Sequence, residues 1–456
     1  MIKSKFTQKV NIKPLDGDFR QKSFWLKTLP EVSGIEPLKG STKCDIAVIG
    51  GGFTGLSTAY NLRLLLPGVD VRVMEANICG FGSSGRNGGF SSTLFGMDKS
   101  LTALRFGKIN AISAHHYMED AVEYLEGIIE KNKINCEYEK RGSLLVATTP
   151  SQTRRIDQQI RLADKWNLEG FELWDEKRLA DEFNTKEYHR GMYYRKTGLL
   201  NPALLTRGSV KMAREAGAIV HEMSPVRSIK KNSTGFCIYT PDGELKAEKV
   251  IFATNAYSIL FSGLSAKQTP IFQNIIVSEP LSREQINSIG WQSRCGIDDA
   301  RTQFHYYRLT SDNRLLIGGG NIKPVFKQKI DQDHNEKVFT LLRSHILKIF
   351  PQLRGLNFTH EWGGPVSITV DMAPAISFLG RNQKMLYSLG LMGHGVSMAP
   401  YNGLCLAELV AGKKTRRTEM FFVGRKVPSW PPHLIRFPLL QFISGIMKAE
   451  DRFRWD

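Results

Sequence analysis

The feature that most constrains this chain is a glycine motif placed between a predicted buried strand and a helix. The mostly apolar run Asp45 to Ile49 predicts a buried parallel strand. Gly50-x-Gly52-x-x-Gly55 follows and opens a helix predicted from Phe53 to Leu66, which Pro67-Gly68 stops. A second strand is predicted from Val69 to Met74, with Glu75 at its carboxyl end. The order strand, glycine turn, helix, strand and acidic residue predicts a βαβ unit that binds a dinucleotide.

Each part of this unit has a physical task. Gly50 permits the tight turn, Gly52 lets the backbone approach a pyrophosphate, and Gly55 lets helix and strand pack closely. The helix N-terminus offers free N–H groups to the diphosphate. We expect the Glu75 carboxylate to accept hydrogen bonds from the adenosine ribose and to disfavour a 2′-phosphate, which argues against NADP. The alternative is a glycine-rich turn without a ligand, and the whole context disfavours it.

A second glycine-rich run, Gly80 to Gly89, comes directly after the second predicted strand. So many glycines in ten residues imply that the backbone lies against a flat or charged group. Its small residues and its single arginine, Arg86, suit a pyrophosphate and an isoalloxazine ring. The alternative is a flexible surface loop.

These stretches together resemble the D-amino-acid oxidase/glycine oxidase superfamily, and within it most of all the γ-glutamylputrescine oxidoreductase branch. The resemblance runs from about Phe24 to Cys405. Its motifs are Val48 to Ser57, Glu75-Ala76, Ser84 to Gly89, Ala253 to Tyr257, Tyr307 to Thr310, Asn313 to Leu315 and Gly393 to Gly395. The first motif is shared by many flavoproteins, whereas Ser84 to Gly89 is much more specific to this branch.

The resemblance implies FAD and the oxidation of a primary or secondary amine. A hydride passes from the substrate α-carbon to flavin N5, and the imine is hydrolysed to an aldehyde or an oxo acid. The amine must be neutral to react, so a cavity that lowers its pKa would help. The best-matched substrate is a γ-glutamylputrescine-like amine. The alternative within the superfamily is a D-amino acid or N-methylglycine dehydrogenase. Oxygen or a quinone is expected to accept the electrons.

The motifs and the resemblance together predict a set of cofactor-binding residues. These are Gly50, Gly52, Phe53, Thr54, Gly55, Glu75, Ala76, Ser83, Ser84, Gly85, Arg86, Asn87, Gly88, Gly89, Ala253, Thr254, Asn255, Gly393, His394, Gly395 and Val396. The monomeric sarcosine oxidase branch attaches its flavin through a cysteine. Aligned on Thr369 and Asp371, that position is Gly364 here, so the FAD is expected to be noncovalent. No metal site is predicted.

Gly393-His394-Gly395 precedes a helix predicted from Val396 to Val410. By resemblance this turn lies at the flavin. A helix N-terminus there would place positive partial charge where reduced flavin is negative. His394 is a candidate catalytic base. The favoured alternative is that His394 packs beside the flavin, since hydride transfer from a neutral amine needs no strong base.

The run Phe304 to Arg308 alternates between aromatic and polar residues, so one face of a strand could line a substrate pocket. Tyr307 and Arg308 are the catalytic candidates in this strand. Arg308 would suit a substrate carboxylate, such as that of a γ-glutamyl group. The equally weighted alternative is a surface strand with a solvated arginine.

The strand and helix patterns predict an α/β fold. They include a long amphipathic helix at 109–132, a helix that starts at Asn201-Pro202, where Asn caps and Pro suits the first helical position, and a short strand from Val250 to Ala253. An FAD-binding, Rossmann-like, doubly wound domain is expected from non-contiguous segments, with a mixed α+β substrate domain between them. The FAD-binding segments are 41–110, 201–260 and 356–415, and the substrate segments are 111–200 and 261–355. An N-terminal arm (1–40) and a C-terminal tail (416–456) complete the 456 residues.

Composition limits the partners and the compartment. Six cysteines lie far apart without a CxxC pair, which indicates reduced thiols and, together with the lack of an apolar leader, a cytoplasmic protein. No segment has the roughly 20 apolar residues of a membrane span. A net charge of +18 leaves a nucleic-acid-modifying flavoprotein as a remote alternative. The interleaved aromatic and basic residues of RNA platforms are missing, so nucleic acid is not favoured as a partner.

The C-terminal stretch Trp430 to Phe453 is aromatic, basic and interrupted by proline. It has an apolar helix face formed by Leu434, Phe437, Leu439, Leu440, Phe442 and Ile443. One interpretation is weak contact with a membrane surface, from which a quinone would take electrons. The favoured interpretation is a tail that packs on its own domain.

Overall fold

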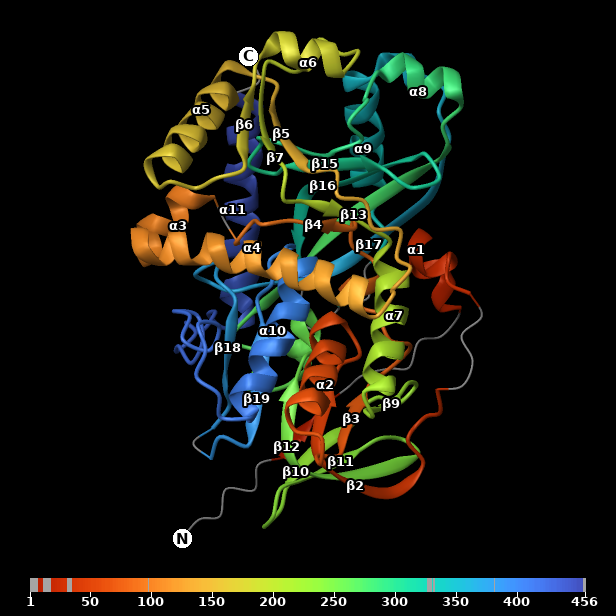
Figure 1. Ribbon diagram of the computed structural model, residues 1–456, viewed down its shortest axis with the longest axis vertical. Coiled ribbons are helices and arrows are strands. Elements are labelled where there is room, and N and C mark those ends of the chain that lie inside the picture. Colours follow the sequence, from red (N-terminus) through yellow and green to blue (C-terminus); the bar gives the residue numbers. More distant parts are fainter. Residues whose placement is uncertain are drawn as a thin grey trace.

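Two large sheets, one in the lower and one in the upper half of Figure 1, organise the chain. The computed structural model describes residues 7–10, 18–30, 35–96, 98–325, 330, 333–380 and 382–453. Much of the predicted N-terminal arm therefore lies outside the described residues. Its apolar centre is described and forms the short helix α1 (Phe24–Lys27), which packs on the body of the protein with Trp25 buried.

The lower sheet has a parallel centre and an antiparallel extension. Its main order is β1-β10-β11-β12-β2-β3-β9, and β19 also pairs with β12. The parallel strands are β2 (Gly40–Ile49), β3 (Val71–Met74), β9 (Ile219–His221), β12 (Gly243–Phe252) and β19 (Met385–Leu389). The antiparallel strands are β1 (Thr7–Lys9), β10 (Ser228–Lys231), β11 (Phe236–Tyr239) and β18 (Ala375–Phe378), the last beside β19. Ile49 is in register with both Met74 and Phe252, so these strands end at one edge of the sheet.

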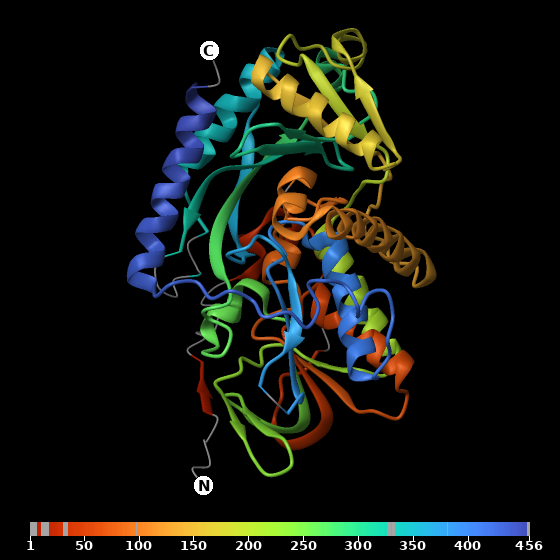
Figure 2. The same ribbon diagram turned by 90° about the vertical axis from the view of Figure 1, so that its left-hand side faces the viewer.

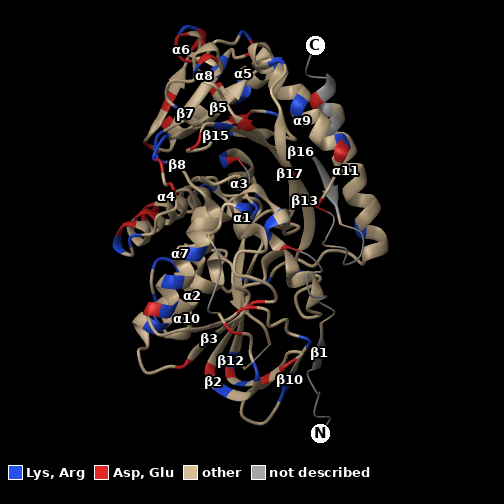
Figure 3. Ribbon diagram, turned by 90° about the vertical axis from the view of Figure 1, so that its right-hand side faces the viewer, with Lys and Arg blue, Asp and Glu red and all other residues tan. Residues whose placement is uncertain are grey.

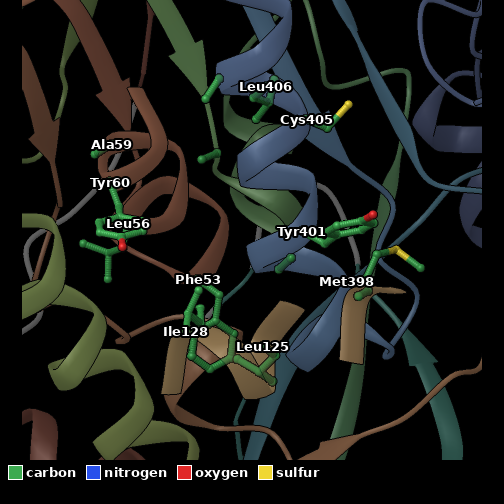
Figure 4. Close-up of a cluster of buried hydrophobic side chains, with 14 of the residues drawn as sticks. Phe53, Leu56, Ala59, Tyr60, Leu125, Ile128, Met398, Tyr401, Cys405 and Leu406 are labelled. Carbon is green, nitrogen blue, oxygen red and sulfur yellow. The ribbon is translucent and has the colours of Figure 1, made fainter. Parts of the chain in front are cut away.

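Helices α2 (Phe53–Leu65), α4 (Lys108–Lys131), α7 (Pro202–Glu215) and α10 (Gly395–Val410) pack around the parallel strands. Helix α2 is buried over most of its length because α10 lies directly against it. The Ser57 hydroxyl donates a 2.6 Å hydrogen bond to the Pro400 carbonyl of α10. Figure 4 shows Phe53 and Leu56 of α2 in one apolar cluster with Tyr401 of α10.

The upper sheet is mixed, with the order β17-β13-β16-β15-β14-β5-β7-β6. Its strands are β5 (Ser143–Ala147), β6 (Phe171–Trp174), β7 (Arg190–Tyr194), β13 (Thr269–Pro280), β14 (Gly296–Asp299), β15 (His305–Leu309), β16 (Arg314–Pro324) and β17 (Phe358–Ile368). Helix α9 (Glu336–Ile349) covers one face, whereas helix α5 (Pro150–Lys165) packs on the other face at the β5-β7 end, against Leu145 and Met192. Tyr307 and Ile317 lie under α9 in an apolar core, which leaves the opposite face toward the lower sheet.

Smaller elements join these layers. A two-stranded sheet pairs β4 (Phe90–Ser91) with β8 (Gly198–Leu199). Helices α3 (Lys99–Phe106), α6 (Glu176–Glu182) and α8 (Arg283–Ile289) and four short 3-10 turns fill the connections. The last element, α11 (His433–Phe453), runs along the outside of the molecule in Figure 2. None of the helices in the described part of the chain has the length and apolarity needed to cross a bilayer.

The predicted fold class is confirmed. The predicted βαβ unit forms as β2, α2 and β3, and the long helix predicted near 109–132 is α4. The short strand expected at Val250 to Ala253 is the end of the ten-residue β12, because its first half pairs with the hairpin partner β11. The division into seven segments stays a prediction. One strand departs from it, since β17 lies in the predicted FAD-binding segment 356–415 but pairs with β13 in the upper sheet.

Helix α7 offers a test of local stability. Asn201 caps it as predicted: its side-chain oxygen accepts the N–H groups of Ala203 and Leu204, both at 3.2 Å, and the residue is fully buried. We expect Asn201→Ala to lower the free energy of unfolding by about 1–2 kcal/mol, because two N–H groups lose their acceptor. Urea unfolding measures this change. Asn382→Ala, in an exposed turn, is the control, and equal stability of the two variants would contradict the capping role.

Candidate active site

A cavity of about 740 Å³ lies between the carboxyl edge of the lower parallel strands and the free face of the upper sheet. The lower wall is formed by the predicted glycine turn, by Glu75 and Ala76, and by Ala253 to Asn255 after β12. The upper wall is formed by β13, β14, β15 and β17, through Gln273, Ile275, Asp298, Tyr306 and Gly364. The cavity therefore joins the predicted dinucleotide site to the upper sheet.

The glycine turn is shaped by close backbone contacts. Gly50 has a φ of +110°, and a Cβ there would lie 2.6 Å from the Ala253 carbonyl oxygen. A Cβ at Gly55 would collide with the carbonyl oxygen of Gly50, so strand and helix meet as the motif predicts. Gly52 caps α2 without a side-chain hydrogen bond. The Phe53 N–H donates to Ser84 Oγ at 3.1 Å, and the N–H groups that follow it in the first turn remain for a ligand in the cavity that Phe53 and Thr54 line.

Glu75 holds the rim of this turn. Its carboxylate accepts the N–H groups of Gly51 at 2.7 Å and Asn77 at 3.0 Å. Burial raises the pKa of Glu75 to about 7, an effect that the two N–H groups partly oppose and the charge of Glu222 reinforces. The carboxylate thus faces the cavity at the end of β3, where the dinucleotide hypothesis requires an acceptor for ribose hydroxyls.

The run Gly80 to Gly89 is fixed by contacts from distant parts of the chain, unlike a flexible surface loop. Trp25 donates its indole N–H to the Asn87 carbonyl at 2.8 Å, and Trp362 of β17 donates to the Arg86 carbonyl at 2.9 Å. The Arg86 guanidinium is almost fully buried and donates to the Tyr257 hydroxyl at 2.8 Å. Both sheets and the N-terminal arm therefore hold the run in place.

Most of the predicted cofactor-binding residues lie together in the cavity wall. Three glycines do not: Gly55, Gly85 and Gly89. Each packs behind the wall, where a Cβ would collide with the carbonyl oxygens of Gly50, Gly80 and Leu200 respectively. Their contribution is close packing of the backbone that carries the lining residues.

His394 caps α10 and is half-buried in the wall of the cavity. Burial lowers the pKa of His394 to about 4, against a small opposing effect of a backbone hydrogen bond with Gly96. The imidazole is therefore neutral near pH 7 and a poor proton acceptor. This geometry supports the packing role.

Tyr307 and Arg308 lie outside the cavity, and the geometry supports neither as a catalytic residue. Tyr307 points into the core under α9, where its hydroxyl lies 2.6 Å from that of Tyr188. Arg308 is 1% exposed. It donates to the carbonyls of Leu200 at 2.9 Å and Gly89 at 3.1 Å, so it ties β15 to the glycine-rich run and is not available to a substrate carboxylate.

The cavity face of the upper sheet holds residues that sequence reasoning did not identify. Tyr306 and Phe304 line the cavity, and Asp298 of β14 stands opposite Tyr306 in the strand register. Burial raises the pKa of Asp298 to about 7, and the neighbouring charge of Asp299 adds to this shift. Strand alternation around Tyr307 indicated that one face lines the pocket, but not which face.

The neighbouring Asp299 belongs to a buried cluster with His305 and His345. Their ligand atoms are close enough together to hold a metal ion, but the Arg301 side chain lies among them. Its Nε is 3.3 Å from an Asp299 oxygen, and one terminal nitrogen is 2.7 Å from His345 Nδ1. The guanidinium holds the pKa of Asp299 well below its usual range despite burial. We interpret the cluster as an internal ion network and not as a metal site.

Comparison with known proteins decides the family. The model of the FAD dependent oxidoreductase (DAO) family matches residues 45–409. The chain belongs to this family. It is 31% identical to γ-glutamylputrescine oxidoreductase of Escherichia coli (strain K12) over 435 residues, which cover 94% of this chain and 98% of that protein. It is 24% identical over 387 residues to glycine oxidase of Geobacillus kaustophilus, with 81% and 94% covered. The crystal structure of that species' glycine oxidase superposes with a TM-score of 0.71 at 20% identity, covering 85% of this chain and 100% of that one.

These findings confirm the superfamily resemblance and make the chain an FAD-dependent oxidoreductase. The cavity fits the cofactor. The free N–H groups of α2 and the Glu75 carboxylate suit its diphosphate and ribose. Asn255 in the wall has a buried side-chain oxygen that accepts a hydrogen bond from no described residue, and a bound dinucleotide could supply the donor. No cysteine stands among the described lining residues, and Gly364 is one of them; noncovalent binding stays a prediction.

The contact between Gly55 and Gly50 gives a direct prediction. We expect Gly55→Ala to lose most of its bound FAD, because the added methyl group forces α2 away from β2 and moves the first-turn N–H groups. The ratio of absorbance at 450 nm to that at 280 nm in the purified protein reports this occupancy. Gly68→Ala is the matched control, since a Cβ at Gly68 meets nothing within 4 Å. Full FAD occupancy in Gly55→Ala would contradict the role of this contact.

The mode of attachment is tested separately. After precipitation with trichloroacetic acid, we expect all of the flavin in the supernatant, because no thiol lines the described cavity wall. Absorbance at 450 nm of the two fractions makes the measurement. Yellow colour that stays in the washed pellet would mean a covalent bond.

Proposed function

We propose that this chain oxidises an amine that carries no carboxylate on its reacting carbon, with γ-glutamylputrescine as the model substrate. One observation carries the proposal: Asp298 presents a carboxylate to the cavity from the upper sheet and forms no ion pair with any described residue. A carboxylate at that wall suits a cationic substrate. The aromatic rings of Tyr306 and Phe304 beside it suit an alkylammonium chain.

The basic residues of the cavity support the same choice. Among the described lining residues these are Lys22 and Arg86. Lys22 forms a 2.8 Å ion pair with Asp333, and Arg86 is held by Tyr257 and by backbone carbonyls. An α-amino acid needs a cation for its carboxylate. Arg308 is occupied and both described lining cations are engaged, so a carboxylate on the reacting carbon would have no free cation beside it. The carboxylate of a γ-glutamyl group is remote from the reacting carbon and does not need one there, which makes a D-amino acid or N-methylglycine dehydrogenase the less supported alternative.

Similarity to the γ-glutamylputrescine oxidoreductase of E. coli supports this substrate class, because it extends over nearly the whole length of both proteins. Support for nucleic acid as a substrate is lacking. The net charge of +18 does not change this, because the cavity presents the Asp298 carboxylate, which pairs with no described residue, and a carboxylate repels phosphate.

The chemistry asks the protein for two things. Bound FAD would supply the acceptor for two electrons. The chain must hold the reacting carbon in line and provide the amine in its neutral form. An alkylammonium group is charged in water, but burial lowers its pKa while burial raises that of Asp298 to about 7. The two values approach each other, so Asp298 can take the ammonium proton before the C–H bond breaks.

Tyr306 and Phe304 would exclude water from this pair. The imine then leaves for hydrolysis to an aldehyde. A cytoplasmic location and an electron acceptor that is oxygen or a quinone stay predictions.

The substrate class is tested by anaerobic mixing of the FAD-loaded protein with γ-glutamylputrescine, putrescine, glycine, sarcosine and D-alanine. We expect γ-glutamylputrescine or putrescine to bleach the 450 nm band and the three amino acids to leave it unchanged. Admission of air afterwards reveals whether oxygen restores the band. Bleaching by an amino acid alone would overturn the proposed substrate, although not the family.

The role of Asp298 is tested by pH. Its pKa is raised above the usual carboxylate range to about 7, so the side chain accepts protons only above that pH. We expect kcat/KM to fall about tenfold per unit as the pH drops below 7. Asp298→Asn should lower the bleaching rate about 10²-fold at pH 8 and flatten this part of the profile. Asp164→Asn, exposed on α5, is the control. An unchanged acidic limb in Asp298→Asn would remove Asp298 from the mechanism.

A further inference from the structure

Helix α11 turns its apolar side chains toward solvent. The exposed fractions are 82% for Leu434, 58% for Ile435, 40% for Leu439, 68% for Phe442, 41% for Ile443 and 53% for Ile446. At 100° per residue these six positions fall on one half of the helix. The other exposed residues between His433 and Met447 are Pro438, Gln441 and Gly445, so this half carries no charge over these positions. In Figure 3 the middle of α11 correspondingly has neither a basic nor an acidic colour.

The opposite half of α11 is anchored by polar contacts. Asp451 accepts the N–H groups of Thr302 and Gln303, both at 2.8 Å. The Gln303 amide donates to Ser444 Oγ at 3.1 Å, and Ser444 and Arg436 are each 8% exposed. A helix that buries polar residues and exposes apolar ones has the reverse of the usual pattern. The hydrogen bonds of Asp451 and Ser444 hold the polar half of α11 against the protein, so the apolar half must face solvent.

An exposed apolar surface of this kind is typical of an interaction site. The six side chains extend along most of a helix that is about 30 Å long, at 1.5 Å per residue. Helix α11 does not meet the requirement for crossing a bilayer. A helix with one apolar side, too polar to span, lies in the plane of the lipid headgroups with that side buried.

The charge of the protein indicates which surface fits. The net charge of +18 opposes pairing of two copies through this helix and favours an anionic surface. Two basic residues lie near the segment that leads into α11. Lys426 is exposed, and the pKa of Lys267 is lowered by burial and, to a smaller extent, by repulsion from Lys426. The backbone N–H of Trp430 donates to the Ala266 carbonyl at 2.7 Å, which places Lys267 close to the segment that leads into α11.

We propose that α11 docks this protein on the surface of a membrane that contains anionic lipid. Leu440, on the inner half, belongs to a buried apolar cluster with Met392, and Val366 packs against that cluster. Val366 lines the cavity, so docking places the cavity wall close to the lipid surface. The proposal does not depend on which amine is oxidised.

The test uses the full-length, FAD-loaded protein and flotation with vesicles of phosphatidylcholine, with or without 30% phosphatidylglycerol. We expect the protein to float with the anionic vesicles and at least tenfold less with phosphatidylcholine alone. The triple variant Phe442→Ser, Ile443→Ser, Ile446→Ser should reduce flotation with anionic vesicles at least tenfold. Leu104→Ser on α3 is the matched control, because Leu104 is 82% exposed but lies on another element.

FAD absorbance and the thermal midpoint show that the variants are folded, since the substituted side chains face solvent. Flotation that is lost only in the α11 variant supports the proposal. Three outcomes overturn it. The first is no flotation of the wild type at low salt, and the second is equal flotation of wild type and triple variant. The third is a wild-type dimer in analytical ultracentrifugation that the triple variant dissociates, with no vesicle binding; in that case a second copy covers the helix.

Discussion

The rest of the structure depends on the close approach of β2 and α2 at Gly50 and Gly55. Because neither residue has a side chain, the helix starts directly above the strand end and its first N–H groups face the cavity. The same position of α2 lets α10 pack on its other side, where Gly403 lies against the backbone of Thr54 and Thr58. Both helices therefore direct their N-termini into one cavity, which concentrates positive partial charge where a dinucleotide is bound.

A second constraint joins the two sheets. The glycine-rich run from Gly80 to Gly89 receives hydrogen bonds from Trp25, Trp362 and Arg308, which come from three distant parts of the chain. Such long-range contacts form only when both sheets are in place. The cofactor site is consequently a product of the whole fold and not of the βαβ unit alone.

The sequence was sufficient where a local rule determines the geometry. The spacing of Gly50, Gly52 and Gly55 predicted the βαβ unit, and Asn201-Pro202 predicted the start of α7. The sequence was insufficient where a local pattern allows several side-chain positions and only tertiary packing determines which one forms. Alternation in β15 grouped Tyr306 with Arg308, but packing set the Arg308 guanidinium on backbone carbonyls and left Tyr306 in the cavity.

The aspartate pair shows the same limit. Asp298 and Asp299 are adjacent and chemically identical, yet opposite faces of β14 give one to the cavity and the other to Arg301. In α11, periodicity identified an apolar stripe with Leu434, Leu439, Phe442 and Ile443. It did not show that the polar side would be the buried one, because Asp451 finds its partners some 150 positions away. A local sequence pattern carries no information about contacts between residues so far apart in the chain.

The loop from Thr302 to Phe304 belongs to two surfaces at once. The backbone N–H groups of Thr302 and Gln303 bind Asp451 of α11, and the next residue, Phe304, forms part of the cavity wall. Thermodynamic linkage is reciprocal. If binding of a ligand shifts Phe304 and changes the free energy of anchoring α11, then anchoring of α11 changes the free energy of binding that ligand by the same amount. Ligand binding in the cavity and the anchoring of α11 are therefore coupled through this one short loop.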